Sequence, residues 1–317
     1  MSAQAGHGAH ASVEAAQLNE VAPGVYSYVQ PDGTWFINNM GFIAGSSAVV
    51  SIDTTSTERR NKAYLDAIAS VTSYPVKVVV NTHHHADHTH GNYQFTDATI
   101  ISHARCRDVM VAAGIPDYSA VFPGVEWGDL QFRAPDVTFE GSMVLHLDDR
   151  RIELSDLGFV AHTDGDIVAW LPDCRVLFCG DLIFHGGTPF ALFGSVSGTI
   201  QAMDAIESFG ADVIVPGHGP HFGGDDIARV LDEQRSYLRF VQEAAAEGIT
   251  AGRTPLEQAQ ATDLGPHGRY TDPERLAGNL HVAYREAQST DYEFPGVPQA
   301  IMDMVAYNGG ALPRCVA

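Results

Sequence analysis

Short apolar runs bounded by glycine, proline or aspartate alternate along the chain with segments whose apolar residues recur at helical spacing. Residues 55–71 show the helical spacing, and a second helix is expected at 103–113. Residues 76–80 form an uninterrupted apolar run after a proline, which is typical of a strand buried on both faces. The strands expected in this part are residues 25–29, 35–44, 48–53, 76–80 and 99–102.

The same succession of strands, a helix and further strands then occurs a second time. The strands expected here are residues 137–139, 143–147, 151–154, 167–171, 176–179 and 213–215. The expected helices are residues 199–209, 225–247, 255–261, 273–288 and 298–305. Two such passes predict an α/β fold, a sandwich with two sheets inside and helices outside.

We expect the chain to have three parts. Residues 1–20 lack the basic and apolar segments of a secretory signal and are expected to form a flexible polar leader. Residues 21–240 are expected to form the sandwich domain. Residues 241–317 carry helical charge patterns and are expected to form a helical extension packed on the same domain. This extension could cover a pocket or form the interface of a homodimer, which we favour as the oligomeric state.

Composition and charge narrow the classes of partner. The 317 residues include 18 Lys and Arg against 39 Asp and Glu, a formal net charge of −21. That charge disfavours nucleic acid and anionic membranes, which both attract basic surfaces, so neither is expected as a partner. The four cysteines include no Cys-x-x-Cys pair and are expected to be reduced, in a protein of the cytoplasm.

Five of the 15 histidines fall between positions 83 and 90, directly after the apolar run at 76–80. Residues i and i+2 of an extended segment point the same way, so His83 and His85 can offer their imidazoles to one cation. Asp87 and His88 then fall in the following turn, where they can reach a second cation. The sequence therefore predicts a metal site at the end of this strand.

Three further candidates follow later apolar runs. His162, Asp181 and His218 each stand just past an expected strand, as ligands at the mouth of a sheet would. Imidazole and carboxylate ligands without thiolate suit Zn²⁺, and Fe or Mn can use the same set. Histidines are more often ordinary surface or core residues, and we favour that plain interpretation for His84 and His90.

The spacing of these residues resembles that of the metallo-β-lactamase superfamily, over about residues 22–220. The matching motifs, in the family's order, are Thr82-His83-x-His85-x-Asp87-His88-x-x-Gly91-Asn92, His162, Asp181 and Pro216-Gly217-His218-Gly219. The resemblance implies an αββα sandwich with two zinc ions at the edge of its sheets. The implied ligands are His83, His85 and His162 for one zinc, Asp87, His88 and His218 for the other, and Asp181 as the bridge.

Two zinc ions in such a site would make the protein a hydrolase. Cations roughly 3.5–4 Å apart can share a water molecule and lower its pKa, so that hydroxide forms at pH 7. Asp87 would be the catalytic residue, because it can bind metal and also act as the base that orients this water. Asp53 ends an expected strand and fits two roles equally, accepting an imidazole N–H or capping the helix that follows.

Several branches of the superfamily are disfavoured. True β-lactamases typically carry Cys or Ser at the position of Asp181, and flavin-linked diiron members carry Glu at that of His85. The net charge of −21 opposes an RNA-processing role. We expect hydrolysis of a hydrophobic thioester or ester. A lactonase or a glyoxalase-II-like thioesterase is the alternative, and a non-catalytic metal-binding scaffold is disfavoured because structural zinc needs only four closed ligands.

The apolar, glycine-rich segment 182–195 follows directly after Asp181, and the hairpin tip at 28–36 could oppose it as a lid. Two interpretations of this segment remain open. It could pack into the core or form a dimer contact, or it could line a pocket for a flat, aromatic or lipid-like substrate. The residues expected to bind substrate are Trp35, Phe36, Phe184, Phe190 and Phe193.

A narrower resemblance concerns the substrate. Residues 29–33, 161–166 and 186–192 resemble a subgroup of actinobacterial cyclases of aromatic polyketides. The resemblance implies thioester cleavage coupled to aldol ring closure. The partner implied is an acyl substrate, either a small molecule or an acyl group bound to a carrier protein.

Overall fold

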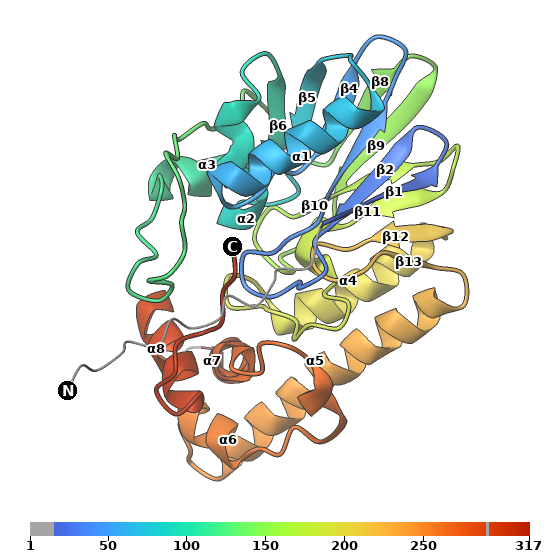
Figure 1. Ribbon diagram of the computed structural model, residues 1–317. Helices are drawn as coiled ribbons and strands as arrows, with labels where there is room; N and C mark the ends of the chain where they lie inside the picture. The colour runs from blue at the N-terminus through green and yellow to red at the C-terminus, as the bar shows by residue number, and fades with distance from the viewer. Residues whose placement is uncertain (1–15, 290–291) are drawn as a thin grey trace, which may run out of the picture.

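Two sheets face each other at the centre of the molecule, as the sequence predicts. The computed structural model describes residues 16–289 and 292–317 (Figure 1). In the first sheet the first four strands run antiparallel, and the last three continue parallel to the fourth. In order across the sheet they are β1 (Gln17–Ala22), β2 (Val25–Val29), β3 (Met40–Ala44), β4 (Val49–Ile52), β5 (Val76–Val80), β6 (Thr99–His103) and β7 (Val137–Phe139).

The second sheet has six strands, of which β11 and β12 are parallel while all other neighbours are antiparallel. In order they are β13 (Phe222–Gly223), β12 (Val213–Val215), β11 (Val176–Phe178), β10 (Ile167–Leu171), β9 (Arg150–Asp156) and β8 (Ser142–Leu147). Parallel neighbours end at the same edge of a sheet. The segments after β4 and β5 therefore leave the first sheet side by side, as those after β11 and β12 leave the second.

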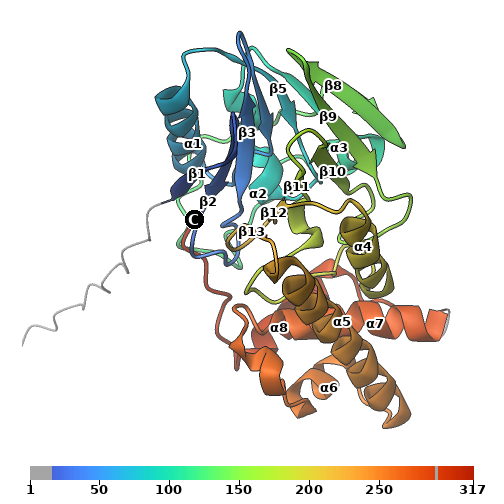
Figure 2. The same ribbon diagram turned by 90° about the vertical axis from the view of Figure 1, so that its right-hand side faces the viewer.

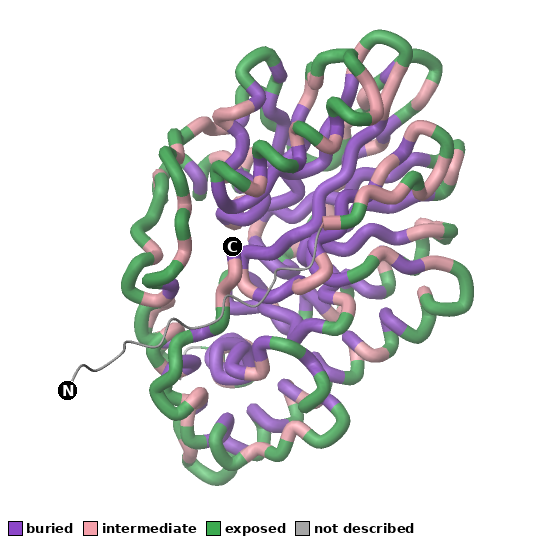
Figure 3. Tube along the Cα trace, in the orientation of Figure 1, coloured by how far each residue is buried: buried purple, intermediate pink, exposed green. Residues whose placement is uncertain are grey.

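The apolar core lies between the inner faces of the sheets. Ile52 and Val80 of the first sheet pack in one buried cluster with Leu154, Phe178 and Val215 of the second. Figure 3 shows this centre as a continuous buried band. Burial of apolar side chains from both sheets is the main source of stability in such a sandwich.

Helices cover both outer faces, which confirms the αββα sandwich. Tyr64 and Ile68 of α1 (Glu58–Val71) pack on the first sheet. Met203 and Ile206 of α4 (Val196–Ser208) pack on the second. The remaining helix near the first sheet, α3 (Ala104–Ala113), follows β6 and contacts β6 and β7.

A helical layer completes the fold beyond the second sheet (Figure 2). Its helices are α5 (Asp226–Thr250), α6 (Pro255–Ala261), α7 (Arg275–Gln288) and α8 (Val297–Tyr307). Every residue of α7 from Arg275 to Tyr284 is buried, because α5, α6 and α8 all contact it. The expected boundary between residues 240 and 241 falls inside α5, which packs Leu231 on the sandwich and Val241 in the helical layer. Helix α5 therefore continues from the sandwich into the helical layer, without a boundary at this position.

Two expectations for the N-terminal region need correction. The leader expected at 1–20 lies outside the described residues up to position 15, but residues 17–20 belong to β1, where Gln17 pairs with Val29. The strand expected at 35–44 begins only at Met40. Phe36 has a φ of 62°, in the left-handed region, and the amide of Ile37 donates to Thr34 across a turn. No helix among the described residues is long and apolar enough to cross a membrane.

The contact between the two sheets can be tested at Gly41 in β3. A Cβ on this residue would overlap the ring of Phe178 from the second sheet and lie 2.7 Å from the carbonyl oxygen of Tyr26. We expect Gly41→Ala to lower the free energy of unfolding by about 1–3 kcal/mol, as overpacked cores do, measured by urea denaturation. Gly124→Ala is the matched control, since nothing lies within 4 Å of its added Cβ. Equal stability of the two variants would contradict the sheet contact.

Candidate metal centre

The seven residues predicted to bind metal meet at one edge of the sandwich. Four of them lie on the segment after β5, which continues into the short helix α2 (Ala86–Thr89), and the others follow β9, β11 and β12. They are His83, His85, Asp87, His88, His162, Asp181 and His218. The parallel pairs β4–β5 and β11–β12 bring their carboxyl ends to this edge. The strand order therefore explains why residues so distant in sequence converge.

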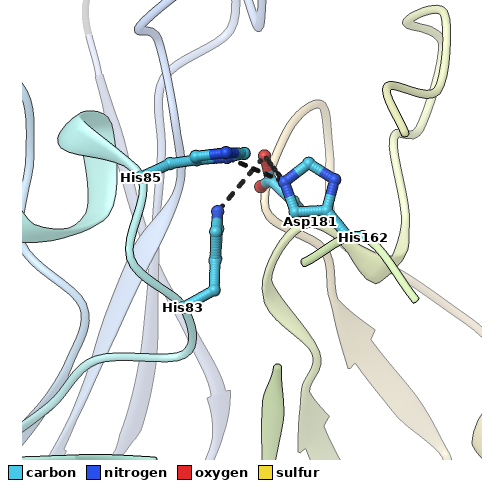
Figure 4. Close-up of side chains that lie close together, drawn as sticks. All are labelled: His83, His85, His162 and Asp181. Carbon is cyan, nitrogen blue, oxygen red and sulfur yellow. Dashed lines mark hydrogen bonds and ion pairs between the residues drawn. The ribbon is translucent and has the colours of Figure 1, made fainter. Parts of the chain in front are cut away.

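One group of donors consists of three imidazoles around a carboxylate. Figure 4 shows His83, His85 and His162 pointing toward Asp181. Nε2 of His162 lies 2.9 Å from Nδ1 of His85 and 3.4 Å from Oδ2 of Asp181. Nε2 of His83 lies 3.8 Å from the same oxygen. All four donor atoms lie within 4.8 Å of one another, which allows them to hold one metal ion.

The second group shares Asp181 and adds a second carboxylate. Nε2 of His218 lies 3.2 Å from Oδ2 of Asp87 and 3.3 Å from Oδ2 of Asp181. Nε2 of His88 lies 3.0 Å from Oδ1 of Asp181. Asp181 therefore offers one carboxylate to both groups, as a bridging ligand would.

Hydrogen bonds fix which imidazole nitrogen carries the proton. Nδ1 of His162 donates to the carbonyl oxygen of Phe190 at 2.6 Å, and Nδ1 of His218 donates to that of Gly33 at 3.1 Å. In a neutral ring, Nε2 then carries a lone pair, and in both rings it faces Asp181. Lone pairs opposite carboxylate oxygens require a cation between them, either a proton or a metal ion.

Unpartnered polar atoms support a metal rather than protons alone. Nε2 of His88 and Oδ1 of Asp181 are close but lack hydrogen-bond partners, as does Nε2 of His83. Buried polar atoms are normally hydrogen-bonded, so a group of unpartnered ones indicates a bound ion or water. The residues therefore fit a pair of metal ions, and their imidazole and carboxylate donors are those that zinc accepts.

The titration behaviour of the two groups differs. Burial lowers the pKa of His162 to about 4, and it lowers the pKa of His83 and of His85 well below the ordinary value. Burial also opposes the charge on His218, but the carboxylates of Asp181 and Asp87 raise the pKa of that ring to about 9. The second group, which holds two carboxylates, therefore attracts positive charge more strongly than the first.

Asp53 holds one of the candidate metal ligands, His88, in place. It follows β4, and its carboxylate accepts hydrogen bonds from the Thr82 amide, the Thr82 hydroxyl and Nδ1 of His88, at 2.7, 2.7 and 2.8 Å. The sequence left two roles open for Asp53. Thr57 caps helix α1, so the structure favours the role in which Asp53 orients an imidazole.

Gly217 allows the loops after β11 and β12 to approach each other closely. Its amide donates to the carbonyl oxygen of Gly180 at 2.7 Å. A Cβ at position 217 would overlap Oδ1 of Asp181 and lie 2.8 Å from the Asp181 amide. Glycine is therefore required beside the shared carboxylate.

A cavity of about 310 Å³ adjoins the first group of donors. Among the seven ligands His85 alone lines it, together with His84 and His90, for which we had favoured ordinary positions. Burial lowers the pKa of both these rings to about 4, so they are neutral at pH 7. Alternation along an extended strand predicts that His84 points away from its neighbours, so sequence patterning does not indicate that it lines a cavity.

Of the five aromatic residues expected to bind substrate, Phe193 lines this cavity, with its ring centre 4.8 Å from that of His85. The others pack within the protein. Phe184 stacks on His218 with ring centres 5.0 Å apart, and Phe190 packs edge-on against Trp35. Nε1 of Trp35 donates to Glu274. The ring of Phe36 contacts the rings of Tyr118, Phe122 and Trp127.

Comparisons with known proteins agree with this geometry. A family model for the metallo-beta-lactamase superfamily matches residues 33–218. A linear primary-alkylsulfatase from Pseudomonas sp. is 23% identical over 266 residues, which cover 71% of this chain and 50% of that protein. The human acyl-coenzyme A thioesterase MBLAC2 is 26% identical over 216 residues, covering 61% of this chain and 76% of that protein. This chain thus spans half the length of the alkylsulfatase.

A further relative is the cytoplasmic hydroxyacylglutathione hydrolase of Saccharomyces cerevisiae, 24% identical over 68% of this chain and 78% of that protein. Among solved structures, the sec-alkylsulfatase Pisa1 from Pseudomonas sp. has a TM-score of 0.68 at 22% identity, covering 93% of this chain and 55% of that chain. A metallo-beta-lactamase from Pontibacter korlensis has a TM-score of 0.58 at 19% identity, covering 71% and 99%. The chain belongs to the metallo-beta-lactamase superfamily.

Proposed function

We propose that this protein is a zinc-dependent hydrolase that cleaves a hydrophobic thioester or ester. The observation that carries the proposal is a pair of donor groups sharing Asp181, one of which borders an apolar cavity through His85. A structural zinc site needs only four closed ligands, so seven donors beside a cavity favour catalysis over a scaffold. Relatives named as an acyl-coenzyme A thioesterase and a hydroxyacylglutathione hydrolase support a thioester as the bond cleaved.

Two divalent cations in these groups would supply Lewis acidity and lower the pKa of water at the site. Burial raises the pKa of Asp87, but His88 and His218 outweigh this effect and lower it below the ordinary value. Asp87 is therefore ionised at neutral pH, and its carboxylate can accept a hydrogen bond from the attacking water and orient it. His85 belongs to the first donor group and also lines the cavity, so a carbonyl held beside it would lie next to that group.

Ring closure is a narrower form of the same proposal. Groups that stabilise the oxyanion formed in thioester cleavage also stabilise an enolate, the reactive species of an aldol reaction. The acyl group can be presented as a small molecule or on a carrier protein. A cyclised acid, rather than the open-chain acid, would be the product that marks this activity.

Sulfate esters are a second candidate, because an alkylsulfatase is among the relatives. A sulfate ester carries a permanent negative charge and calls for a free cation. The arginine on the cavity wall, Arg133, donates to the carbonyl oxygens of Phe95 and Ala98 and to Asp136. An uncharged carbonyl substrate therefore fits the cavity better, and alkyl sulfates belong in the substrate panel as a comparison.

Metal dependence tests the proposal directly. We expect the purified protein to contain two transition-metal ions per chain and to cleave acyl thioesters, and we expect chelation to abolish turnover. Readdition of zinc should restore turnover and raise the melting temperature, because a ligand that binds the folded state alone stabilises it. Turnover unchanged by chelation, or metal-loaded protein that cleaves no ester, thioester, lactone or alkyl sulfate, would contradict the proposed function.

The role of Asp53 gives a second prediction. Asp53→Asn removes the charge that holds His88 but leaves all seven proposed ligands in place. We expect a roughly 10–100-fold weaker affinity for zinc, as is typical when the partner of a metal-binding imidazole is lost, measured by competition with a zinc-binding dye. Asp66→Asn, on the exposed side of α1, is the matched control. Wild-type affinity in Asp53→Asn would show that this carboxylate does not tune the site.

A further inference from the structure

The cavity beside His85 is lined mainly by apolar side chains. We propose that it binds the linear aliphatic chain of the substrate, and that α8 limits the length of chain it accepts. The bond that is cleaved at the head of this chain rests on the proposed function. The binding of the chain in the cavity does not depend on it. At about 310 Å³, the cavity lies at the lower end of the range for small-molecule sites.

Three elements form much of the wall, and the third is distant in sequence from the first two, which are consecutive. They are α3, the segment 114–133 and α8, and Figure 1 shows that segment descending from α3 to α8. Among the aliphatic side chains that line the cavity are Val109, Met110, Ala113, Ile115, Val297 and Ile301. Because α8 belongs to the helical layer, that layer takes part in the site and does not merely cover the sandwich.

One of the two donor groups borders the cavity. His85 lines it and belongs to the first group, whereas the second group contributes none of its four donors to the lining. The Phe193 ring stands edge-on to both His84 and His85, with centres 6.1 and 4.8 Å apart. A chain lying in the cavity would therefore bring the bond at its head to the first group, beside Asp181.

Among the described residues, the lining offers no free charge to a ligand. Arg133 is the charged residue of the wall, and its guanidinium is held by two carbonyl oxygens at 2.6 Å and by Asp136 at 3.1 Å. The rings of the lining stand edge-on or tilted to their neighbours, as His84 does to Phe193 and His90 to Tyr118. Contacting ring pairs among the described lining residues are edge-on or tilted rather than stacked, and the aliphatic side chains of the wall suit a flexible aliphatic chain.

The rim of the cavity is also apolar. Four lining residues belong to the exposed large hydrophobic side chains of the protein, at 37 to 45% exposure. They are Val109, Ile115, Phe132 and Phe193. Exposed apolar side chains gathered at a cavity mark a ligand site more often than isolated ones do. A chain that enters here stays in contact with apolar surface from rim to metal ligand.

Acyl thioesters of N-acetylcysteamine, from acetyl to hexadecanoyl, test the assignment in the zinc-loaded protein. Each buried CH₂ contributes about 0.8 kcal/mol, so we expect kcat/KM to rise up to about fourfold per added CH₂ and then to level off once the cavity is full. A 2-naphthoyl thioester should be cleaved less efficiently than the decanoyl one. A profile that is flat with chain length, or a preference for the naphthoyl group, would overturn the proposal.

Variants of α8 show whether this helix sets the limit. Ile301→Trp should lower the ratio of decanoyl to acetyl kcat/KM, and kcat/KM should level off at a shorter chain length. Ile301→Ala should shift this levelling off to longer chains. Met302→Trp is the matched control, because the neighbouring Met302 is 56% exposed and does not line the cavity. Identical profiles for Ile301→Trp and Met302→Trp would overturn the role of α8.

Binding of n-alkanols separates this inference from the proposed function, because an alkanol has no bond to cleave. By calorimetry we expect affinity to rise about fourfold per CH₂ from butan-1-ol to octan-1-ol, with a negative heat-capacity change, and to fall in Ile301→Trp. If alkanols bind in this way while no thioester is cleaved, the cavity assignment stands and the proposed function fails. If thioesters are cleaved but alkanols do not bind, the cavity assignment fails alone.

Discussion

The shared carboxylate of Asp181 is the group on which the rest of the site depends. It is buried, and burial raises the pKa of a carboxylic acid, yet His218 and His88 hold its pKa well below the ordinary range. Asp87 adds a second buried carboxylate 3.2 Å from His218. Burying charges is costly unless they are compensated. The arrangement is therefore stable only with positive charge among these residues, which the proposed metal ions would supply without displacing the hydrogen bonds that orient the rings.

Those hydrogen bonds connect the site to the first sheet and to the helical layer. Asp53 at the end of β4 orients His88, the carbonyl of Gly33 orients His218, and that of Phe190 orients His162. Position 190 lies in the segment that packs on α7, where the Asn279 side chain binds the backbone of neighbouring residues. The helical layer therefore holds one of the imidazoles in place as well as forming one wall of the cavity.

The sandwich fold and the candidate metal ligands were predictable from the sequence. Histidine and aspartate residues that follow strands gather at one sheet edge, so their positions after the expected strands indicated all seven candidate donors. The leader expected at 1–20 was wrong beyond position 15 because QLNEVA lacks the strong apolar run that marked other strands. Asp53 stayed ambiguous because capping and orienting roles require the same residue at the same strand end.

The cavity could not be predicted, because its walls depend on contacts distant in sequence. Val297 and Ile301 have an ordinary helical spacing that says nothing about where α8 packs. Trp35 and Phe190 suggested a substrate pocket by composition, but they pack together beneath the site with Arg275, whose guanidinium lies 4.4 Å from the Trp35 ring centre. Apolar composition alone does not separate side chains that fill a core from those that line a pocket.

The central claim is that two metal ions share the carboxylate of Asp181. Anomalous diffraction from crystals of the zinc-reconstituted protein tests it most directly. We expect two peaks roughly 3.5–4 Å apart, one among His83, His85 and His162 and the other among Asp87, His88 and His218, with Asp181 between them. A single peak enclosed by four protein ligands, or zinc bound elsewhere on the chain, would contradict it.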